Sequence, residues 1–228
     1  MATLRSSVGG ALIAVSFAFA TVPASAAVIY AQAPRDGGAG VFSNYGALGQ
    51  AADDFTLASD QSAVLLRWWG SYGDAAFAGS DLFAIRLFDS ASANAVPVFA
   101  CGDAAAFPAL PCVGVASSGT PLADDSGGAV FRFELALAAP LDLLSGTTYI
   151  LSVTNENPDT EWFWLQSAPG NGGLFRMEDT EDFGQVGPNL SFALESRSQA
   201  IPEPGSLALL GIATLMLVLG RRRSDRSR

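Results

Sequence analysis

Val130-Phe131-Arg132-Phe133-Glu134-Leu135 alternates apolar and charged side chains over its last five positions. In an extended chain, successive side chains point to opposite faces, so Phe131, Phe133 and Leu135 share one face while Arg132 and Glu134 share the other. The stretch therefore predicts a β-strand with one face in a hydrophobic core.

The same period of two recurs on both sides of this stretch. Residues 82–88 place Phe83, Ile85 and Leu87 together, and residues 147–153 do the same for Thr147, Tyr149, Leu151 and Val153. Further candidate strands are residues 28–32, 53–57, 63–69, 96–100, 161–166, 173–177 and 190–195. Clusters of Gly, Asp, Asn and Pro separate them, and no amphipathic helix of useful length or internal repeat is present. About ten short strands predict an all-β fold, an antiparallel β-sandwich or jelly-roll-like domain.

The N-terminal residues 1–26 have the pattern of a secretory signal peptide. Arg5 supplies a positive charge, an apolar run follows, and Ala24-Ser25-Ala26 has the small residues of a cleavage site. We therefore expect the mature chain to begin at Ala27. A transmembrane helix is the alternative, but the apolar run is short and Pro23 interrupts it.

The C-terminal residues 201–228 combine Pro202-Glu203-Pro204, an uncharged apolar run and Arg221-Arg222-Arg223. The run at 206–220 predicts a single transmembrane helix. Counted from 205 to 220 it rises about 24 Å, slightly less than the roughly 30 Å hydrocarbon core. Arginines after it place the C-terminus in the cytoplasm. A buried core helix is the alternative, but such helices have a polar face and this run has none.

This order of Pro-Glu-Pro, helix and basic tail resembles the PEP-CTERM sorting signal of Gram-negative bacteria. The resemblance implies export through the inner membrane and processing by exosortase, with Pro202, Glu203 and Pro204 as its substrate motif. Four further stretches resemble a recurring ectodomain of such proteins: residues 50–57, 66–72, 144–153 and 161–164. For residues 27–200 the resemblance implies a β-sandwich that ends in the cell envelope, at the cell surface or outside the cell. It implies no ligand or reaction.

The charge of the mature domain excludes one class of partner. Residues 27–200 hold twenty acidic residues against six arginines, a net charge of −14. A surface of this sign repels phosphate backbones, so we expect no nucleic acid partner.

Cys101 and Cys112 are the two cysteines of the chain. In an exported protein, an isolated pair this close predicts a disulfide. A metal site is the alternative, but the chain has no histidine and no third cysteine.

The residue inventory argues against most enzyme chemistry. Without histidine or lysine, the chain has no Ser-His-Asp triad, no Schiff-base lysine and no ordinary zinc site. A pair of carboxylates of the kind used by glycoside hydrolases remains, but twenty acids make some close pair inevitable. We therefore expect no enzyme and no cofactor, with a carboxylate-based glycoside hydrolase as the least favoured alternative.

The tryptophans suggest a carbohydrate site as an alternative to a core role. Trp162 and Trp164 would share one face of a strand, where an exposed pair could stack on the sugars of an exopolysaccharide. Aromatic side chains in a sandwich more often lie in the core, which is the favoured interpretation. Trp68 and Trp69 are adjacent, so at most one points inward and Trp69 is a further candidate.

Three acidic clusters are candidate Ca²⁺ sites, because they lie near expected loops and Ca²⁺ prefers oxygen ligands. The candidate ligands are Asp53 with Asp54, Asp124 with Asp125, and Asp179 with Asp182. None fits an EF-hand or a glycine-rich β-roll, so solvated carboxylates are the favoured interpretation. For function, we expect a non-enzymatic structural or adhesive module, with a carbohydrate- or calcium-binding module as the alternative.

Overall fold

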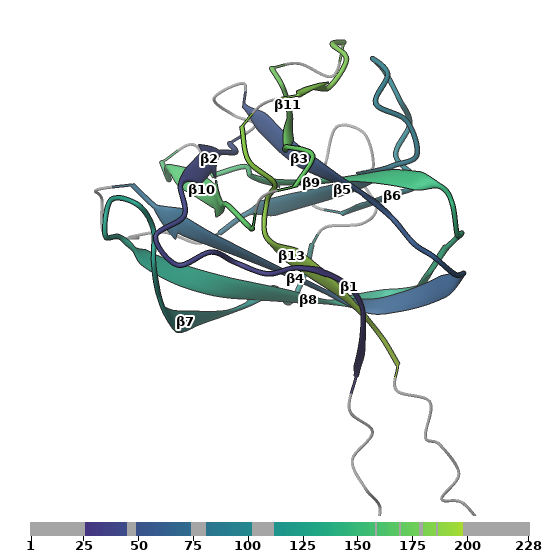
Figure 1. The fold of residues 1–228 in the computed structure, drawn as a ribbon, viewed down its shortest axis with the longest axis horizontal. Coiled ribbons are helices and arrows are strands. Elements are labelled where there is room, and N and C mark those ends of the chain that lie inside the picture. Colours follow the sequence, from purple (N-terminus) through teal and green to yellow (C-terminus); the bar gives the residue numbers. More distant parts are fainter. Residues whose placement is uncertain are drawn as a thin grey trace, which may run out of the picture.

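Thirteen strands in two antiparallel sheets make up the described part of the chain, in a computed structural model (Figure 1). The structure describes residues 26–44, 49–73, 81–101, 112–157, 159–168, 170–177, 180–185 and 187–197. The signal peptide up to residue 25, the expected helix at 206–220, Pro202, Glu203, Pro204, Asp179 and Arg221 to Arg223 lie outside these ranges. The signal peptide and the transmembrane helix stay predictions.

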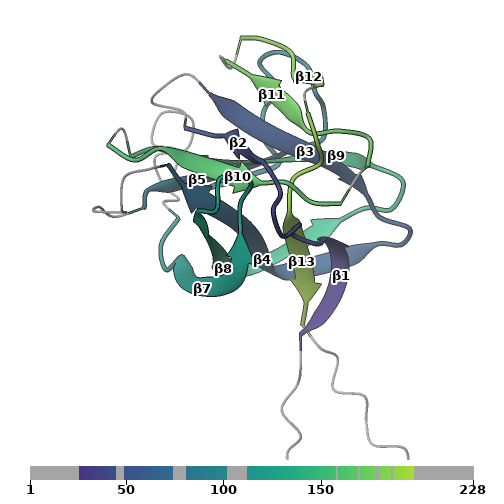
Figure 2. The ribbon, with the colours of Figure 1, turned by 60° about the vertical axis from the view of Figure 1, so that its left-hand side comes forward.

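The larger sheet is organised around one long central strand, β4. One path of hydrogen-bonded strands runs through β1 (Ala27–Gln32), β13 (Phe192–Ser196), β4 (Gln61–Tyr72), β10 (Trp162–Leu165) and β2 (Gly40–Phe42). Two more strands, β8 (Ala129–Leu143) and β7 (Ala116–Ala123), extend the sheet from β4. At its start β1 pairs Ala27 with Ser196, so the two ends of the domain lie side by side, as Figure 2 also shows.

The smaller sheet has six strands. Their order is β12 (Gly184–Gln185), β11 (Leu174–Arg176), β3 (Gln50–Thr56), β9 (Thr148–Asn155), β5 (Phe83–Phe88) and β6 (Phe99–Cys101). The two sheets face each other, so the fold is a β-sandwich.

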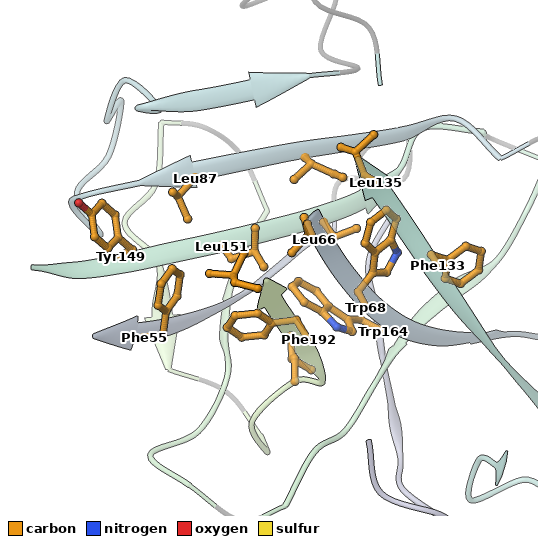
Figure 3. Close-up of a cluster of buried hydrophobic side chains, with 14 of the residues drawn as sticks. Phe55, Leu66, Trp68, Leu87, Phe133, Leu135, Tyr149, Leu151, Trp164 and Phe192 are labelled. Atoms are coloured by element: carbon orange, nitrogen blue, oxygen red, sulfur yellow. The ribbon is translucent and has the colours of Figure 1, made fainter. Parts of the chain in front are cut away.

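The main core lies between the sheets and is rich in aromatic rings (Figure 3). The alternation of residues 130–135 predicts one buried face, and this is confirmed because Phe133 and Leu135 of β8 are buried in this core. Phe133 packs on Trp68 of β4 with ring centroids 5.7 Å apart, and on Phe83 of β5 at 4.8 Å. These contacts join the two sheets directly.

A second, smaller cluster covers the other face of the six-stranded sheet. It contains Ala52, Phe88, Ile150 and Phe183. The guanidinium carbon of Arg176 lies 4.3 Å from the ring centroid of Phe183 and 5.2 Å from that of Phe88, as in a cation–π contact. The six-stranded sheet is therefore buried on both faces over much of its length.

Each of the ten candidate strands overlaps a strand of the structure, although β6 begins at Phe99 and not at residue 96, and three more strands are present. The added strands are β2, β7 and β12. The strand expected at residues 130–135 is longer than predicted, since β8 continues to Leu143. Its pairing with β4 shifts register between Ala63 and Leu65, opposite the segment that contains Pro140.

Candidate functional site

Trp162 and Trp164 lie in the core, and neither has any exposed surface. Their ring centroids are 6.4 Å apart, and the indole nitrogen of Trp164 donates to the carbonyl of Ser191 at 2.8 Å. The carbohydrate contact suggested for this pair is wrong, because a buried ring cannot stack on a sugar. The favoured interpretation, which places the pair in the core, is confirmed.

Trp69 is the third tryptophan of the carbohydrate hypothesis, and its side chain lies on the face of β4 opposite to the core. Its neighbour Trp68 is fully buried, whereas Trp69 is partly exposed on the outer face of the seven-stranded sheet. Directly across from it on β8 stands Arg132. The sequence expectation that one of the two adjacent tryptophans points outward is therefore met.

A row of alternating charges runs beside Trp69 across three strands of the same face. Arg67 of β4 donates from Nε to Glu134 of β8 at 2.7 Å and also pairs with Glu195 of β13. Arg132 extends the row, with Nε 3.1 Å from Glu134. Trp69 and these charges form one surface, which we call the Trp69 face: Arg67, Trp69, Arg132 and Glu134. It combines an aromatic ring with charged hydrogen-bonding groups, and the arginines had no assigned role in the sequence.

Asp53 is fully buried, and its carboxylate joins the two sheets. It accepts hydrogen bonds from the backbone N–H of Asp54, at 2.8 Å, and of Leu190, which leads into β13. Gln32 of β1, with its amide turned to donate, lies 2.9 Å from the same carboxylate. Burial raises the pKa of Asp53 to about 7, although these hydrogen bonds oppose the rise. Asp53 acts as a clamp between the sheets, and its oxygens are already engaged.

Asp124 shapes the turn between β7 and β8. Its Oδ1 accepts from the backbone N–H of Ser126 at 3.0 Å, from the Ser126 hydroxyl at 2.7 Å and from the N–H of Gly128 at 2.7 Å. Burial works to raise the pKa of Asp124, but bonds from Ser126, Ser71 and Gly128 outweigh it and leave the pKa below its usual range. Asp125, next in the chain, is exposed.

The other proposed calcium ligands are dispersed. Asp54 lies on the opposite face of β3 from Asp53 and accepts from the amide of Asn171 at 2.6 Å. Asp182 accepts from the backbone N–H of Ala93 at 2.6 Å. Within the described ranges, no three acidic or cysteine side chains come together as ligands of one metal would. Because Asp179 lies outside those ranges, calcium at its cluster stays a prediction.

A polar cluster that the sequence did not indicate lies at the end of β4. The hydroxyl of Tyr72 is 2.8 Å from both oxygens of Asp81, and the amide of Asn155 donates to Asp81 Oδ1 at 2.8 Å. Burial raises the pKa of Asp81 despite these two donors, and burial followed by the nearby carboxylate raises the pKa of Tyr72. Asn155 is 74 residues away from Asp81 in the chain, so no local pattern could reveal this cluster.

The predicted disulfide is present between Cys101 and Cys112, whose Cα atoms are 4.8 Å apart. Cys101 ends β6 and is part of the main core, so the bond attaches Cys112 to the six-stranded sheet. Its role is structural.

The signal peptide, the apolar run at 206–220 and the Pro-Glu-Pro motif are identified from the sequence. Over the part of the chain that the structure covers, no helix is long and apolar enough to span a membrane. The candidate span at 206–220 falls beyond that part.

Comparison with known proteins gives one match. Residues 200–224 match the model of the PEP-CTERM protein-sorting motif. Neither a curated protein nor a solved structure matches the chain. The matched segment includes Pro202, Glu203 and Pro204, the apolar run and Arg221 to Arg223. Such a motif implies an exported protein that exosortase sorts to the cell envelope or surface. The chain therefore carries a PEP-CTERM protein-sorting motif at residues 200–224.

Proposed function

We propose that the folded domain is a non-enzymatic structural or adhesive module of the cell envelope or extracellular matrix. The observation that carries this proposal is the use of the buried carboxylates. Asp53 and Asp124 accept hydrogen bonds from backbone N–H groups, and Asp81 accepts from Tyr72 and Asn155. Carboxylates engaged in this way hold strands and turns in place. Asp53 and Asp124 are also buried, so a substrate has no access to them for the exchange of protons.

The proposal includes the route that the protein takes. Signal peptidase releases Ala27 as the new N-terminus, and the helix at 206–220 holds the chain in the inner membrane. Exosortase then acts near Pro202, Glu203 and Pro204. The closeness of Ala27 to Ser196 supports this route, because both membrane-directed segments leave the domain at one point. Neither segment would have to cross the folded domain.

A domain exchange tests the structural role separately from sorting. Residues 27–197 are replaced by an unrelated monomeric β-sandwich, while residues 1–26 and 198–228 are kept. We expect the hybrid to be exported and processed like the natural chain but to lose retention in the extracellular matrix. If the hybrid is retained as well as the natural protein, the folded domain has no structural or adhesive role.

Carbohydrate binding by the Trp69 face is the second candidate, and the partial exposure of Trp69 favours it. A flat indole ring can stack on a sugar, while Arg67, Arg132 and Glu134 offer donors and acceptors to its hydroxyls. The test is binding of the purified protein to exopolysaccharide from the same cells. Trp69→Ala should weaken binding at least tenfold and Trp69→Phe should retain part of it. Equal binding by Trp69→Ala and the natural protein would remove this candidate.

A further inference from the structure

β7 forms one margin of the seven-stranded sheet, as Figures 1 and 2 show. Among the described strands, only β8 pairs with it. Ala116, Ser117, Ser118 and Gly119 are all exposed. An edge strand of this kind presents a row of backbone N–H and C=O groups that another strand can pair with.

The edge also has none of the charges that usually prevent such pairing. Residues 104–123 contain no charged side chain, and they are the longest uncharged stretch of the mature domain. Elsewhere the domain carries a strong negative charge, so two copies repel each other when other surfaces approach. The β7 edge itself adds no charge to this repulsion, so two copies can approach each other there.

The side chains leave room for a neighbouring strand. A Cβ added at Gly119 would have open space around it, and the three preceding side chains are small. Pro121 lacks a backbone N–H and limits the pairing that β7 can offer at its far end. Residues 116–120 are the part of the edge that can accept a strand.

We propose that two copies of this chain pair edge to edge through residues 116–120 of β7. A symmetric pair is antiparallel, so the two seven-stranded sheets join into one continuous sheet across the dimer. The inference rests on the proposed structural role and names its partner, which is a second copy of the chain.

Sedimentation velocity of the full chain in detergent, over a range of protein concentrations, tests the pairing. The variant Ser117→Lys/Gly119→Lys places two positive charges on the edge. The control Val96→Lys/Val98→Lys makes the same change in charge at two exposed positions outside β7, with 74% and 49% of the valine surface accessible. We expect the edge variant to associate at least tenfold more weakly than the natural chain and the control to associate no more weakly. Equal association of the two variants, or a natural chain that stays monomeric, overturns the proposal.

Cysteine cross-linking in the intact envelope gives a second measurement. Single cysteines at 116, 117, 118, 119 and 120 should form a disulfide-linked dimer at one or two of these positions, and Val96→Cys should form none. Cross-linking no stronger than that of Val96→Cys at all five positions overturns the pairing. That result leaves the domain exchange described above unaffected, so failure of the dimer is distinguishable from failure of the structural role.

Discussion

The indole ring of Trp162 lies directly against Gly70 of the neighbouring strand. A Cβ added to Gly70 would come 2.6 Å from Cε2 and Cζ2 of Trp162, and equally close to the carbonyl oxygen of Phe163. Trp162 also packs edge-on against Phe83, with ring centroids 5.2 Å apart. Gly70 therefore provides the space in which a core tryptophan reaches from one sheet toward the other.

Gly70→Ala should destabilise the domain, because the indole ring and the Phe163 backbone have no room to move away. We expect the free energy of unfolding to fall by about 1–3 kcal/mol, the usual cost of an overpacked core. Urea denaturation measures the change. Gly119→Ala is the control, since nothing lies within 4 Å of its added methyl group, and it should shift stability by less than about 0.5 kcal/mol. Equal effects of the two substitutions would contradict the packing described.

The tryptophans should separate into structural and surface residues when replaced. Trp164→Ala removes a buried ring and its hydrogen bond to Ser191, so we expect a loss of about 3–5 kcal/mol in thermal or urea denaturation. Trp69→Ala removes a partly exposed ring and should cost about 1 kcal/mol or less. A larger loss of stability for Trp69→Ala than for Trp164→Ala would contradict the burial of Trp164 in the core and the exposure of Trp69.

The stability of the domain should fall between pH 5 and pH 8 because of Asp53. Its pKa is about 7 in the folded state against 3.8 for an ordinary aspartate, so between these values the folded state holds a proton that the unfolded state has released. The stabilisation is complete below pH 3.8 and is lost as the pH rises through about 7. From pH 5 to pH 8 the free energy of unfolding should decrease by about 2.5 kcal/mol.

Asp53→Asn provides the comparison for this pH dependence. The variant should be less stable at every pH, because an amide nitrogen cannot accept the hydrogen bond from Leu190. Its stability should nevertheless change less with pH than that of the natural protein. Asp81 also has a raised pKa, so the difference between the two proteins is the informative quantity. Parallel pH profiles would show that Asp53 does not hold the proton.

Reduction of the disulfide should destabilise the sandwich without unfolding it at room temperature. Cys101 and Cys112 are 11 residues apart, and closing a loop of this size contributes about 3 kcal/mol in the chain-entropy model. Cys101→Ser/Cys112→Ser should lower the free energy of unfolding by a similar amount, and a reducing agent should have no further effect on it. A melting temperature of the natural protein that is the same with and without reductant would contradict this role.

The sequence predicted the strands whose side chains alternate, and missed those without that signal. Residues 116–123 are mostly small or polar, so nothing in their pattern marks β7. In β8, Pro140 and the alanines before it hide the continuation of the strand, which the register shift opposite Ala63 accommodates. The burial of the six-stranded sheet on both faces was also missed, because alternation identifies one buried face and does not reveal what covers the other.

The candidate sites were less predictable because they depend on contacts between distant residues. Asp53 looked like a loop carboxylate beside Asp54, yet its partner Leu190 is 137 residues away. The same holds for Asp81 and Asn155. By contrast, the sorting motif is a continuous stretch that is recognised from its own residues, and its match at 200–224 needs no tertiary structure.

The intact mass of the protein from envelope and culture fractions, measured with and without reduction, tests the central claim most directly. Sorting by exosortase predicts a chain that begins at Ala27 and ends between Ala200 and Glu203, with any excess mass belonging to an attached group. Reduction should add the mass of two hydrogens, from Cys101 and Cys112. A mass that includes Arg228 would contradict removal of the helix and make the protein a membrane-anchored domain.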